Sequence, residues 1–585
     1  MSSFRFKNRL GAELIAPDRT RFTLWAPSCE RVFVEVEDLP PIAMRRHADG
    51  TFVAEAPCGA GARYLYRVRD NVTVPDPASR FQPDGVHGRS EILDPDFYDW
   101  KTPDWKGRPW EETIIYETHL GLEGNYEGMK ARLQELADLG ITTVQFMPVN
   151  SFSGHWNWGY DGVLVYAPTP AYGRPEALKD LIDHAHSLGL MVFLDVVYNH
   201  FGPDGNYLLE YAKGFFDPRY DTPWGDGIDF HNPIVADFFI DNALYWLMEY
   251  RFDGLRIDAA WAITDRQWFY KLQSRIHKTV EKGRHVHLIL ENENNDAGLL
   301  RDGYSGQWSE DWHHTLTVML SGEDKGFFLP FHHETTGLLK RVLTEGLAWQ
   351  GEFFPPRQKT RGSPSSDLPP TKFVTFLQNH DQIGNRPLGE RLITLSDPNA
   401  FKAAYALLLL CPMTPMLFLG EEWGSKTPFY FFSDFHGAIG EKVRRGREEQ
   451  FAEYCNLADP EILATLPSPT DPKTFRISRP DRAERDTPEG QAWLARTKEL
   501  LALRHSKITP HLKGAYSAGA DILEEKAVIA SWTLGDGSLL TIAVNLGTDT
   551  VSVPEPENIF YETSLKRASQ TLPPGTLVAA LGRAF

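Results

Sequence analysis

The sequence predicts an α/β protein: a (β/α)8 TIM barrel with an N-terminal β-sandwich domain and a small C-terminal β-sandwich domain. Two observations lead to this prediction. Through the middle of the chain, continuous apolar runs alternate with helical periodicity, which is typical of a parallel sheet covered by helices. At both ends, short segments alternate apolar and polar residues, as half-buried antiparallel strands do.

Residues 1–95 are expected to form the N-terminal sandwich. The runs Arg21–Trp25, Arg31–Val36 and Arg63–Val68 alternate and are rich in residues that favour strands. About seven short strands would fit in this length. The segment Pro75–Ser79 is predicted to be a linker. The domain resembles carbohydrate-binding modules, so glycan binding is an alternative to simple packing against the barrel.

Residues 96–508 are expected to form the barrel, with inserted loops. Helices are predicted at Met129–Leu139 and Leu178–Leu188, each closed by a glycine. The sixth strand gives only a weak signal near Gln307 and Trp308. The other strands are expected at Thr113–Glu117, Thr142–Met147, Leu190–Leu194, Phe252–Asp258, Val286–Glu291, Phe373–Asp381 and Pro415–Gly420.

A predicted helix at Pro488–Leu503 ends the barrel. Thr487 is suited to cap it, because proline is favoured at the first helical position after such a cap. Residues 509–585 are expected to form the C-terminal β-domain. In this region Ala527–Trp532 and Leu539–Asn545 alternate on either side of the turn Gly535–Gly537.

Composition and charge exclude some classes of partner. The chain has 60 Lys and Arg against 79 Asp and Glu, a net charge of -19, which speaks against nucleic acid and anionic membranes as partners. The longest apolar run, Ala403–Cys411, is too short to span a bilayer. The start of the sequence has no apolar signal-peptide core, so a cytoplasmic location is expected.

The four cysteines show neither CxxC pairs nor the spacing of zinc ligands. They are typical of buried thiols in a reducing compartment. A single disulfide between Cys29 and Cys58 stays open, because both lie in one small domain. No metal and no cofactor are expected.

Three carboxylates are the strongest candidates for chemistry. Asp258 and Glu291 end apolar strand-like runs, and Asp381 follows a third. Such acids are costly to bury, and the carboxyl ends of barrel strands meet at one rim, where barrel enzymes have their active sites. Arg256 shares the orientation of Asp258 and would favour its ionised form. Glycoside cleavage needs one ionised and one protonated carboxyl group, although carboxylate clusters also bind metals.

Four segments carry a family resemblance: Asp195–His200, Gly254–Asp258, Glu291 after its strand, and Asn379–Asp381. They resemble the four signature regions of the α-amylase family of glycoside hydrolases. The resemblance implies a retaining mechanism in which Asp258 is the nucleophile and Glu291 the general acid and base. It also implies that Asp381 binds hydroxyls of the reacting sugar. In a retaining enzyme the first two carboxyl groups lie about 5–5.5 Å apart.

The same resemblance implies supporting roles around the reacting sugar. Arg256 would orient Asp258, and Tyr160 would stack beneath the sugar. His200 and His380 would hydrogen-bond its hydroxyls, and Asp161 would support this subsite. Asp195 and Asn199 are interpreted as structural supports.

Loop segments resemble those of one group within the family. Gly154–Asp161 and Thr222–Asp226 are similar to members that cleave the α-1,4 bond next to a terminal trehalose unit. The implied substrate is maltooligosyltrehalose, an α-glucan, and the implied functional partner is the synthase that makes it. Loop tryptophans are candidates for stacking on glucose: Trp156, Trp158 and Trp224.

Two other functions stay open. One is a branching or debranching enzyme of the same family, which acts on α-1,6 bonds. The other is a non-catalytic glycan-binding protein on the same fold.

The sequence also gives predictions for three other places in the chain. Glu293 could share the orientation of Glu291, which is preferred because it directly ends a strand. The basic segment Arg444–Arg447 is interpreted as a solvated or helix-pairing face. The segment Pro355–Pro370 is rich in proline, serine and basic residues and is predicted to be a mobile loop.

Overall fold

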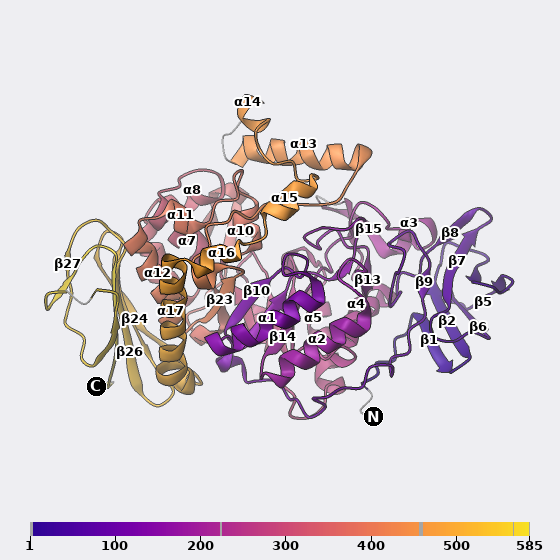
Figure 1. The fold of residues 1–585 in the computed structure, drawn as a ribbon, viewed down its shortest axis with the longest axis horizontal. Helices are drawn as coiled ribbons and strands as arrows, with labels where there is room; N and C mark the ends of the chain where they lie inside the picture. The colour runs from indigo at the N-terminus through magenta and orange to yellow at the C-terminus, as the bar shows by residue number, and fades with distance from the viewer. Residues whose placement is uncertain (1–3, 223–224, 455–459, 565–566, 584–585) are drawn as a thin grey trace.

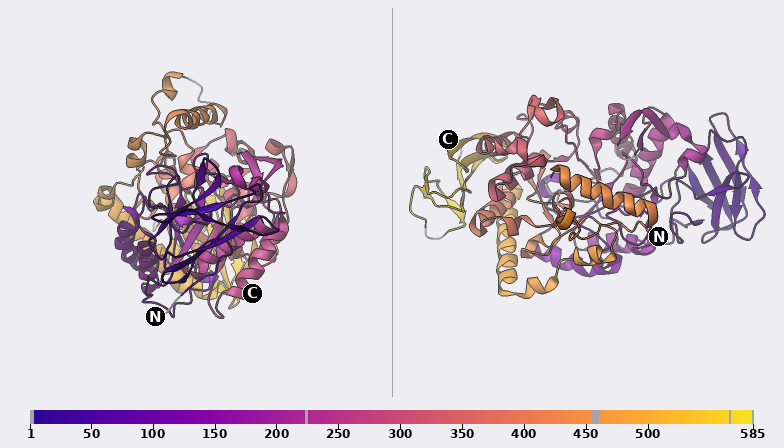
Figure 2. Two further views of the ribbon diagram at one scale, coloured as in Figure 1. Left: turned by 90° about the vertical axis from the view of Figure 1, so that its right-hand side faces the viewer. Right: turned by 90° about the horizontal axis from the view of Figure 1, so that it is seen from above.

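The three predicted parts follow one another along an elongated molecule. The structure is a computed structural model and describes residues 4–222, 225–454, 460–564 and 567–583. The N-terminal sheets lie at one end, the barrel in the middle and the C-terminal sheets at the other end (Figures 1 and 2). Helices α13 (Gly437–Tyr454) and α14 (Pro460–Leu463) stand out from the barrel at the top of Figure 1.

The N-terminal domain is a sandwich of two antiparallel sheets in the described residues. Their strand orders are β1-β2-β6-β5 and β4-β3-β7-β8, with β9 beside β7. Phe22, Phe52, Tyr64 and Tyr66 are buried between the sheets because alternate residues of each strand face inward. The strands are Gly11–Ala16 (β1), Arg19–Trp25 (β2), Phe33–Val36 (β3), Ile42–Ala43 (β4), Arg45–Arg46 (β5), Thr51–Ala56 (β6), Arg63–Arg69 (β7), Val72–Val74 (β8) and Ser90–Glu91 (β9).

The predicted linker segment Pro75–Ser79 is buried in the structure. The Asp76 carboxylate accepts hydrogen bonds from the hydroxyls of Tyr64 at 2.6 Å and Tyr66 at 3.2 Å. These bonds satisfy a buried acid and hold the segment inside the domain.

Arg80, just beyond this segment, fastens the sandwich to the barrel. Its guanidinium lies 4.9 Å from the ring centres of both Tyr166 and Tyr245. Tyr166 belongs to β13 (Leu164–Pro168) and Tyr245 to α4 (Pro233–Met248). The two domains therefore share a buried cation–π contact.

Eight parallel strands in the described part of the chain form a closed barrel. Nearly all of their residues are buried, which explains the continuous apolar runs in the sequence. The weak sixth strand is present at the predicted place. The strands are Ile115–Thr118 (β10), Thr143–Phe146 (β11), Met191–Val196 (β14), Gly254–Ile257 (β17), His287–Leu290 (β18), Gly306–Trp308 (β19), Phe373–Thr375 (β22) and Thr414–Phe418 (β23).

Helices cover the barrel, and the predicted boundaries agree with the structure within a few residues. The first helix ends at Gly140, whose φ of 106° lies in the left-handed region. Thr487 caps the last helix by accepting a hydrogen bond from the amide of Gly490. The principal helices are Asn125–Leu139 (α1), Pro175–Ser187 (α2), Pro233–Met248 (α4), Arg266–Thr279 (α5), Glu310–Ser321 (α7), Thr335–Glu345 (α9), Pro398–Leu410 (α12) and Pro488–Leu503 (α17).

The segment predicted as a mobile loop contains part of a hairpin, so this prediction is wrong in part. Strands β20 (Gln350–Phe354) and β21 (Lys359–Gly362) pair antiparallel. Arg361 of the hairpin forms an ion pair with Asp311 at 2.9 Å, and its guanidinium lies over the ring of Phe354. Proline-rich composition predicted irregular backbone but carried no sign of these long-range contacts.

The C-terminal domain is antiparallel and packs against the barrel. In the described residues its main sheet has the order β24-β25-β26-β30-β28. The indole nitrogen of Trp532 donates to the carbonyl of Leu343 on α9 at 3.1 Å. The strands are Tyr516–Glu524 (β24), Ala527–Thr533 (β25), Ser538–Asn545 (β26), Val551–Ser552 (β27), Ile559–Glu562 (β28), Thr571–Leu572 (β29) and Thr576–Arg583 (β30).

None of the cysteines in the described ranges forms a disulfide. Cys29, Cys58 and Cys411 are free thiols, so the open disulfide is not formed. Cys455 lies outside the described residues. Across the described ranges, we find no helix with the length and apolar character needed to cross a bilayer.

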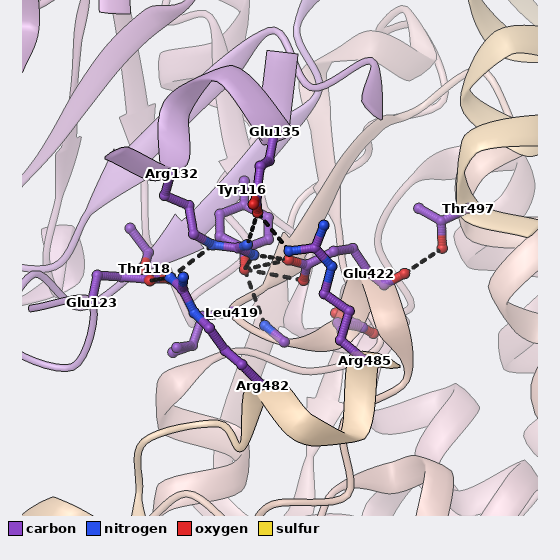
Figure 3. A network of polar contacts seen from close by, with 12 residues as sticks. Tyr116, Thr118, Glu123, Arg132, Glu135, Leu419, Glu422, Arg482, Arg485 and Thr497 are labelled. Atoms are coloured by element: carbon purple, nitrogen blue, oxygen red, sulfur yellow. Dashed lines mark hydrogen bonds and ion pairs between the residues drawn. The ribbon is translucent and has the colours of Figure 1, made fainter. Parts of the chain in front are cut away.

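A buried ion-pair network closes the seam between the first and last barrel strands (Figure 3). The guanidinium of Arg132 on α1 pairs with Glu422, which follows β23. The hydroxyl of Tyr116 on β10 donates to the same carboxylate at 3.0 Å. Strands β10 and β23 are neighbours in the barrel, so the network joins the two ends of the closed sheet.

We expect Arg132→Met to lower the free energy of unfolding by about 3–5 kcal/mol, because it leaves the carboxylate of Glu422 buried without its cation. The matched control is Arg482→Met. Arg482 belongs to the same network, but its side chain is 54% exposed, and exposed ion pairs contribute about 0–1 kcal/mol. Urea unfolding of both variants measures the difference. Equal losses in the two variants would contradict a stabilising role for the buried pair.

Candidate active site

One guanidinium joins carboxylates from three neighbouring barrel strands. Nη1 of Arg256 on β17 lies 2.7 Å from Asp258 and 2.8 Å from Asp195, and Nη2 lies 2.9 Å from Glu291. Asp195 belongs to β14, Asp258 directly follows β17 and Glu291 directly follows β18. These strands are parallel and adjacent, so their carboxyl ends bring the acids to one rim.

The backbone at Ala259, next to Asp258, supplies a hydrogen-bond donor to this cluster. Ala259 has a φ of 38°, a left-handed conformation that is strained for alanine. In this conformation its amide donates to Oε2 of Glu291 at 2.7 Å. Asn199 donates from Nδ2 to Oδ2 of Asp258 at 2.7 Å. Both carboxylates are therefore held by fixed donors.

The carboxyl group of Glu291 differs electrostatically from an ordinary glutamate. Burial raises its pKa well above the usual range, and the nearby carboxylates of Asp258, Glu310 and Asp381 raise it further, against the effect of Arg256. Burial also raises the pKa of Asp195 to about 6, although Arg256 opposes the shift. The site thus favours a protonated Glu291 beside an Asp258 that is paired with Arg256.

The side chain of Glu293 pairs with a different arginine. The Glu293 side chain is 33% exposed and pairs with Arg357 of the β20–β21 connection. The structure brings Glu291, and not Glu293, into contact with Arg256.

His380, Tyr160 and His200 lie close together beside the carboxylates. The rings of Tyr160 and His380 are stacked, with centres 5.1 Å apart, and the Tyr160 hydroxyl donates to Asp195 at 2.8 Å. Nε2 of His200 lies 2.9 Å from the carbonyl oxygen of Tyr160. Burial lowers the pKa of His200, and the carboxylate of Asp258 only partly offsets this effect.

Glu117 is a buried partner that sequence reasoning missed. Its Oε1 lies 2.7 Å from Nδ1 of His380, and its Oε2 accepts from the His380 amide at 3.1 Å. Burial alone would lower the pKa of His380, but the carboxylate of Glu117 outweighs it and raises this pKa. The available signal was an acid inside the apolar run Thr113–Glu117.

Asp381 lies on the short helix α10 (His380–Gly384), where Asn379 caps the helix, and not at the end of β22. Asn385 donates from Nδ2 to Oδ1 of Asp381 and, at 2.9 Å, to its backbone carbonyl. Asp381 lines a cavity of about 570 Å³ together with Glu293, Glu310 and Arg361. A cavity of this size suits sugar residues.

Glu310, at the start of α7, is a second acid that sequence reasoning missed. It lines the same cavity, and burial together with the charge of Asp381 raises its pKa to about 7. The cavity is therefore lined by several carboxyl groups that can accept hydrogen bonds from sugar hydroxyls.

Of the predicted loop aromatics, Trp156 and Trp158 lie in packing positions. Trp158 is 4% exposed, and its indole donates to the carbonyl of Tyr430 at 3.0 Å. Trp156 stacks on Phe475, with ring centres 6.2 Å apart. Trp224 lies outside the described residues. Asp161 accepts from Nδ2 of Asn157 at 2.7 Å, and burial raises its pKa.

Comparison with known proteins gives consistent matches. Residues 91–224 match a family model described as alpha amylase, catalytic domain, and residues 516–578 match a domain of unknown function. The malto-oligosyltrehalose trehalohydrolase of Deinococcus radiodurans is 39% identical over 567 residues, which cover 94% of this chain and 91% of the relative. The enzyme of the same name from Saccharolobus solfataricus is 40% identical over 74% of this chain and 79% of its own length.

A solved structure agrees with this result. The crystal structure of a candidate alpha amylase from Salmonella typhimurium superimposes with a TM-score of 0.93 at 38% identity. The match covers 99% of this chain and 100% of that one.

Proposed function

The chain belongs to the family of the malto-oligosyltrehalose trehalohydrolases, glycoside hydrolases of the α-amylase family, and from this premise we propose that it releases trehalose from maltooligosyltrehalose. The bond cleaved would be the α-1,4 bond next to the terminal trehalose unit. The second product would be a maltooligosaccharide. No cofactor enters the proposed reaction.

The contact of one guanidinium with both Asp258 and Glu291 places two carboxyl groups side by side, and this observation supports the proposed mechanism with a nucleophile and a general acid. In the proposed first step, Asp258 attacks the anomeric carbon, and Glu291 gives its proton to the oxygen of the departing trehalose. In the second step, Glu291 takes a proton from water, and this water displaces Asp258 from the sugar. Two displacements at one carbon retain the anomeric configuration.

The remaining residues are proposed to bind the sugar whose anomeric carbon reacts. Asp381 would accept hydrogen bonds from its hydroxyl groups, which is supported by its place in the wall of the cavity. His200 and His380 would contact the same sugar, and the ring of Tyr160 would stack beneath it. Arg256 would hold Asp258 in position for attack, with Asp161 supporting the subsite.

The proposed substrate also implies a metabolic setting. A synthase that forms maltooligosyltrehalose would be the functional partner. A cytoplasmic location is proposed with it, and the free thiols of Cys29, Cys58 and Cys411 support a reducing compartment.

Product analysis tests the proposed function. The full-length protein, incubated with maltooligosyltrehalose, is expected to release one trehalose per bond cleaved, measured by chromatography. Proton NMR during the first turnovers should show the new reducing end as the α anomer, because the configuration is retained. Loss or gain of α-1,6 branches would instead indicate a debranching or branching enzyme. Glycan binding without turnover would indicate a non-catalytic protein.

A further inference from the structure

The basic segment of α13 does not act as one surface. Arg444 forms ion pairs with Glu441 and Glu448 of its own helix, as expected for a solvated face. Arg447, almost one turn later, extends away from the helix toward the barrel rim. Its Nη2 donates to the carbonyl of Gly384 at 2.8 Å. Arg444 thus lies on a solvated face, whereas Arg447 contacts the end of helix α10.

The second contact of Arg447 is with the side chain that holds Asp381. Nη1 of Arg447 donates to Oδ1 of Asn385 at 2.5 Å. Nδ2 of Asn385 donates in turn to Oδ1 of Asp381. Two hydrogen bonds thus connect a helix outside the barrel with a carboxylate inside the candidate active site.

The chemistry of the three groups fixes the direction of both hydrogen bonds. A guanidinium can only donate, so Arg447 must face the oxygen of the Asn385 amide. The NH₂ group of the amide is then directed to Asp381, whose Oδ1 accepts the hydrogen bond. Without Arg447 the oxygen of the Asn385 amide would keep only the donor of Gln450, at 3.5 Å, so the amide and the carboxylate that it contacts would be held less firmly.

Packing keeps the guanidinium in place. It lies 5.1 Å from the ring centre of Phe431 and 4.9 Å from that of Phe451. Arg447 also donates to Oε1 of Gln450 at 2.6 Å. Asn385 and Gln450 both line the 570 Å³ cavity and an adjoining cavity of about 450 Å³, so the network stands where the two meet.

We propose that Arg447 is a positioning residue that orients Asp381 through the amide of Asn385. The proposal rests on the function proposed above, in which Asp381 binds the reacting sugar. The fixed amide holds the carboxylate in one rotamer before substrate arrives. Such preorganisation contributes most in the transition state, where the sugar is distorted and its contacts are strongest.

The test compares Arg447→Met with Arg444→Met on the same helix. Methionine keeps the apolar packing against Phe431 and Phe451 but removes the donors. We expect kcat/KM for trehalose release to fall about 10- to 100-fold in Arg447→Met, mostly through kcat, because a carboxylate displaced by about 1 Å can cost on the order of 100-fold. Arg444→Met should match the wild type.

A double-mutant cycle with Asn385→Ala measures whether the effect of Arg447→Met on kcat depends on Asn385. A merely structural role of Arg447 would not produce this dependence. If Arg447 acts through Asn385, then Arg447→Met should cause no further loss of kcat in the Asn385→Ala background. Arg447→Lys, which keeps a cation and a donor, should recover part of kcat. This variant also replaces Arg447→Met in the cycle if that variant does not fold.

Three outcomes would overturn the inference: full activity of Arg447→Met, an equal loss in Arg444→Met, or additive losses in the cycle. Each requires an active wild-type enzyme. A wild type that releases no trehalose would instead refute the proposed function, so the two failures can be told apart.

Discussion

Asp258→Asn is expected to lower kcat for trehalose release by about four to six orders of magnitude, the loss typical when an enzyme's nucleophile is removed. An amide has nearly the shape of a carboxylate but cannot form the glycosyl-enzyme intermediate. The measurement is the initial rate of trehalose release at saturating maltooligosyltrehalose.

The structure allows this variant to remain folded. Arg256 keeps its contacts with Asp195 and Glu291, so the substitution leaves no buried cation unpaired. The thermal-unfolding midpoint should therefore stay close to that of the wild type, and glycan binding should persist. A folded Asp258→Asn enzyme with more than about one hundredth of wild-type kcat would contradict the proposed nucleophile.

The second large effect is expected for Glu291→Gln, because glutamine cannot supply a proton to the departing trehalose. General acid catalysis typically contributes about 100- to 10,000-fold, and we expect kcat to fall by that amount. The pH profile should change as well. In the wild type, activity is lost as the pH rises through the raised pKa of Glu291, since only the protonated acid is effective. The variant lacks this acid, so it should not show this loss of activity at high pH.

Glu293→Gln is the matched control for Glu291→Gln. Glu293 carries the same side chain two residues later, but it pairs with Arg357 and does not contact Arg256. Because Glu293 lines the cavity, its substitution can raise KM, but it should leave kcat far above that of Glu291→Gln and should preserve the loss of activity at high pH. The opposite result, with Glu293→Gln inactive and Glu291→Gln active, would assign the acid to Glu293.

The sequence predicted the barrel well because a strand buried on both faces must be apolar throughout. The rule gave only a weak signal at β19, which has three residues including Gln307, although this strand lies where it was predicted. It failed at the end of β22, where the apolar run continues to Leu377 although the strand ends at Thr375. An apolar run shows burial, and burial does not distinguish a strand from a buried loop.

Within the candidate site, the sequence predicted residues that end strands and missed their partners. Asp258 and Glu291 stand out because each follows an apolar run. Glu117, Glu310 and Asn385 act through contacts with residues far away in the chain, and no local pattern marks such a partner. Trp158 is buried in the structure, and an aromatic residue in a loop motif can equally serve as packing support for that loop.

The contact of Arg80 with Tyr166 and Tyr245 has a consequence for how the chain is made. The ribosome finishes the N-terminal sandwich well before it reaches either tyrosine. The sandwich can therefore fold early. The face that carries Arg80 stays exposed to solvent until β13 and α4 have been synthesised. Apolar surface exposed during this interval is the kind that chaperones bind. Because the sandwich is synthesised first, the barrel covers this exposed face only after the sandwich has had time to fold.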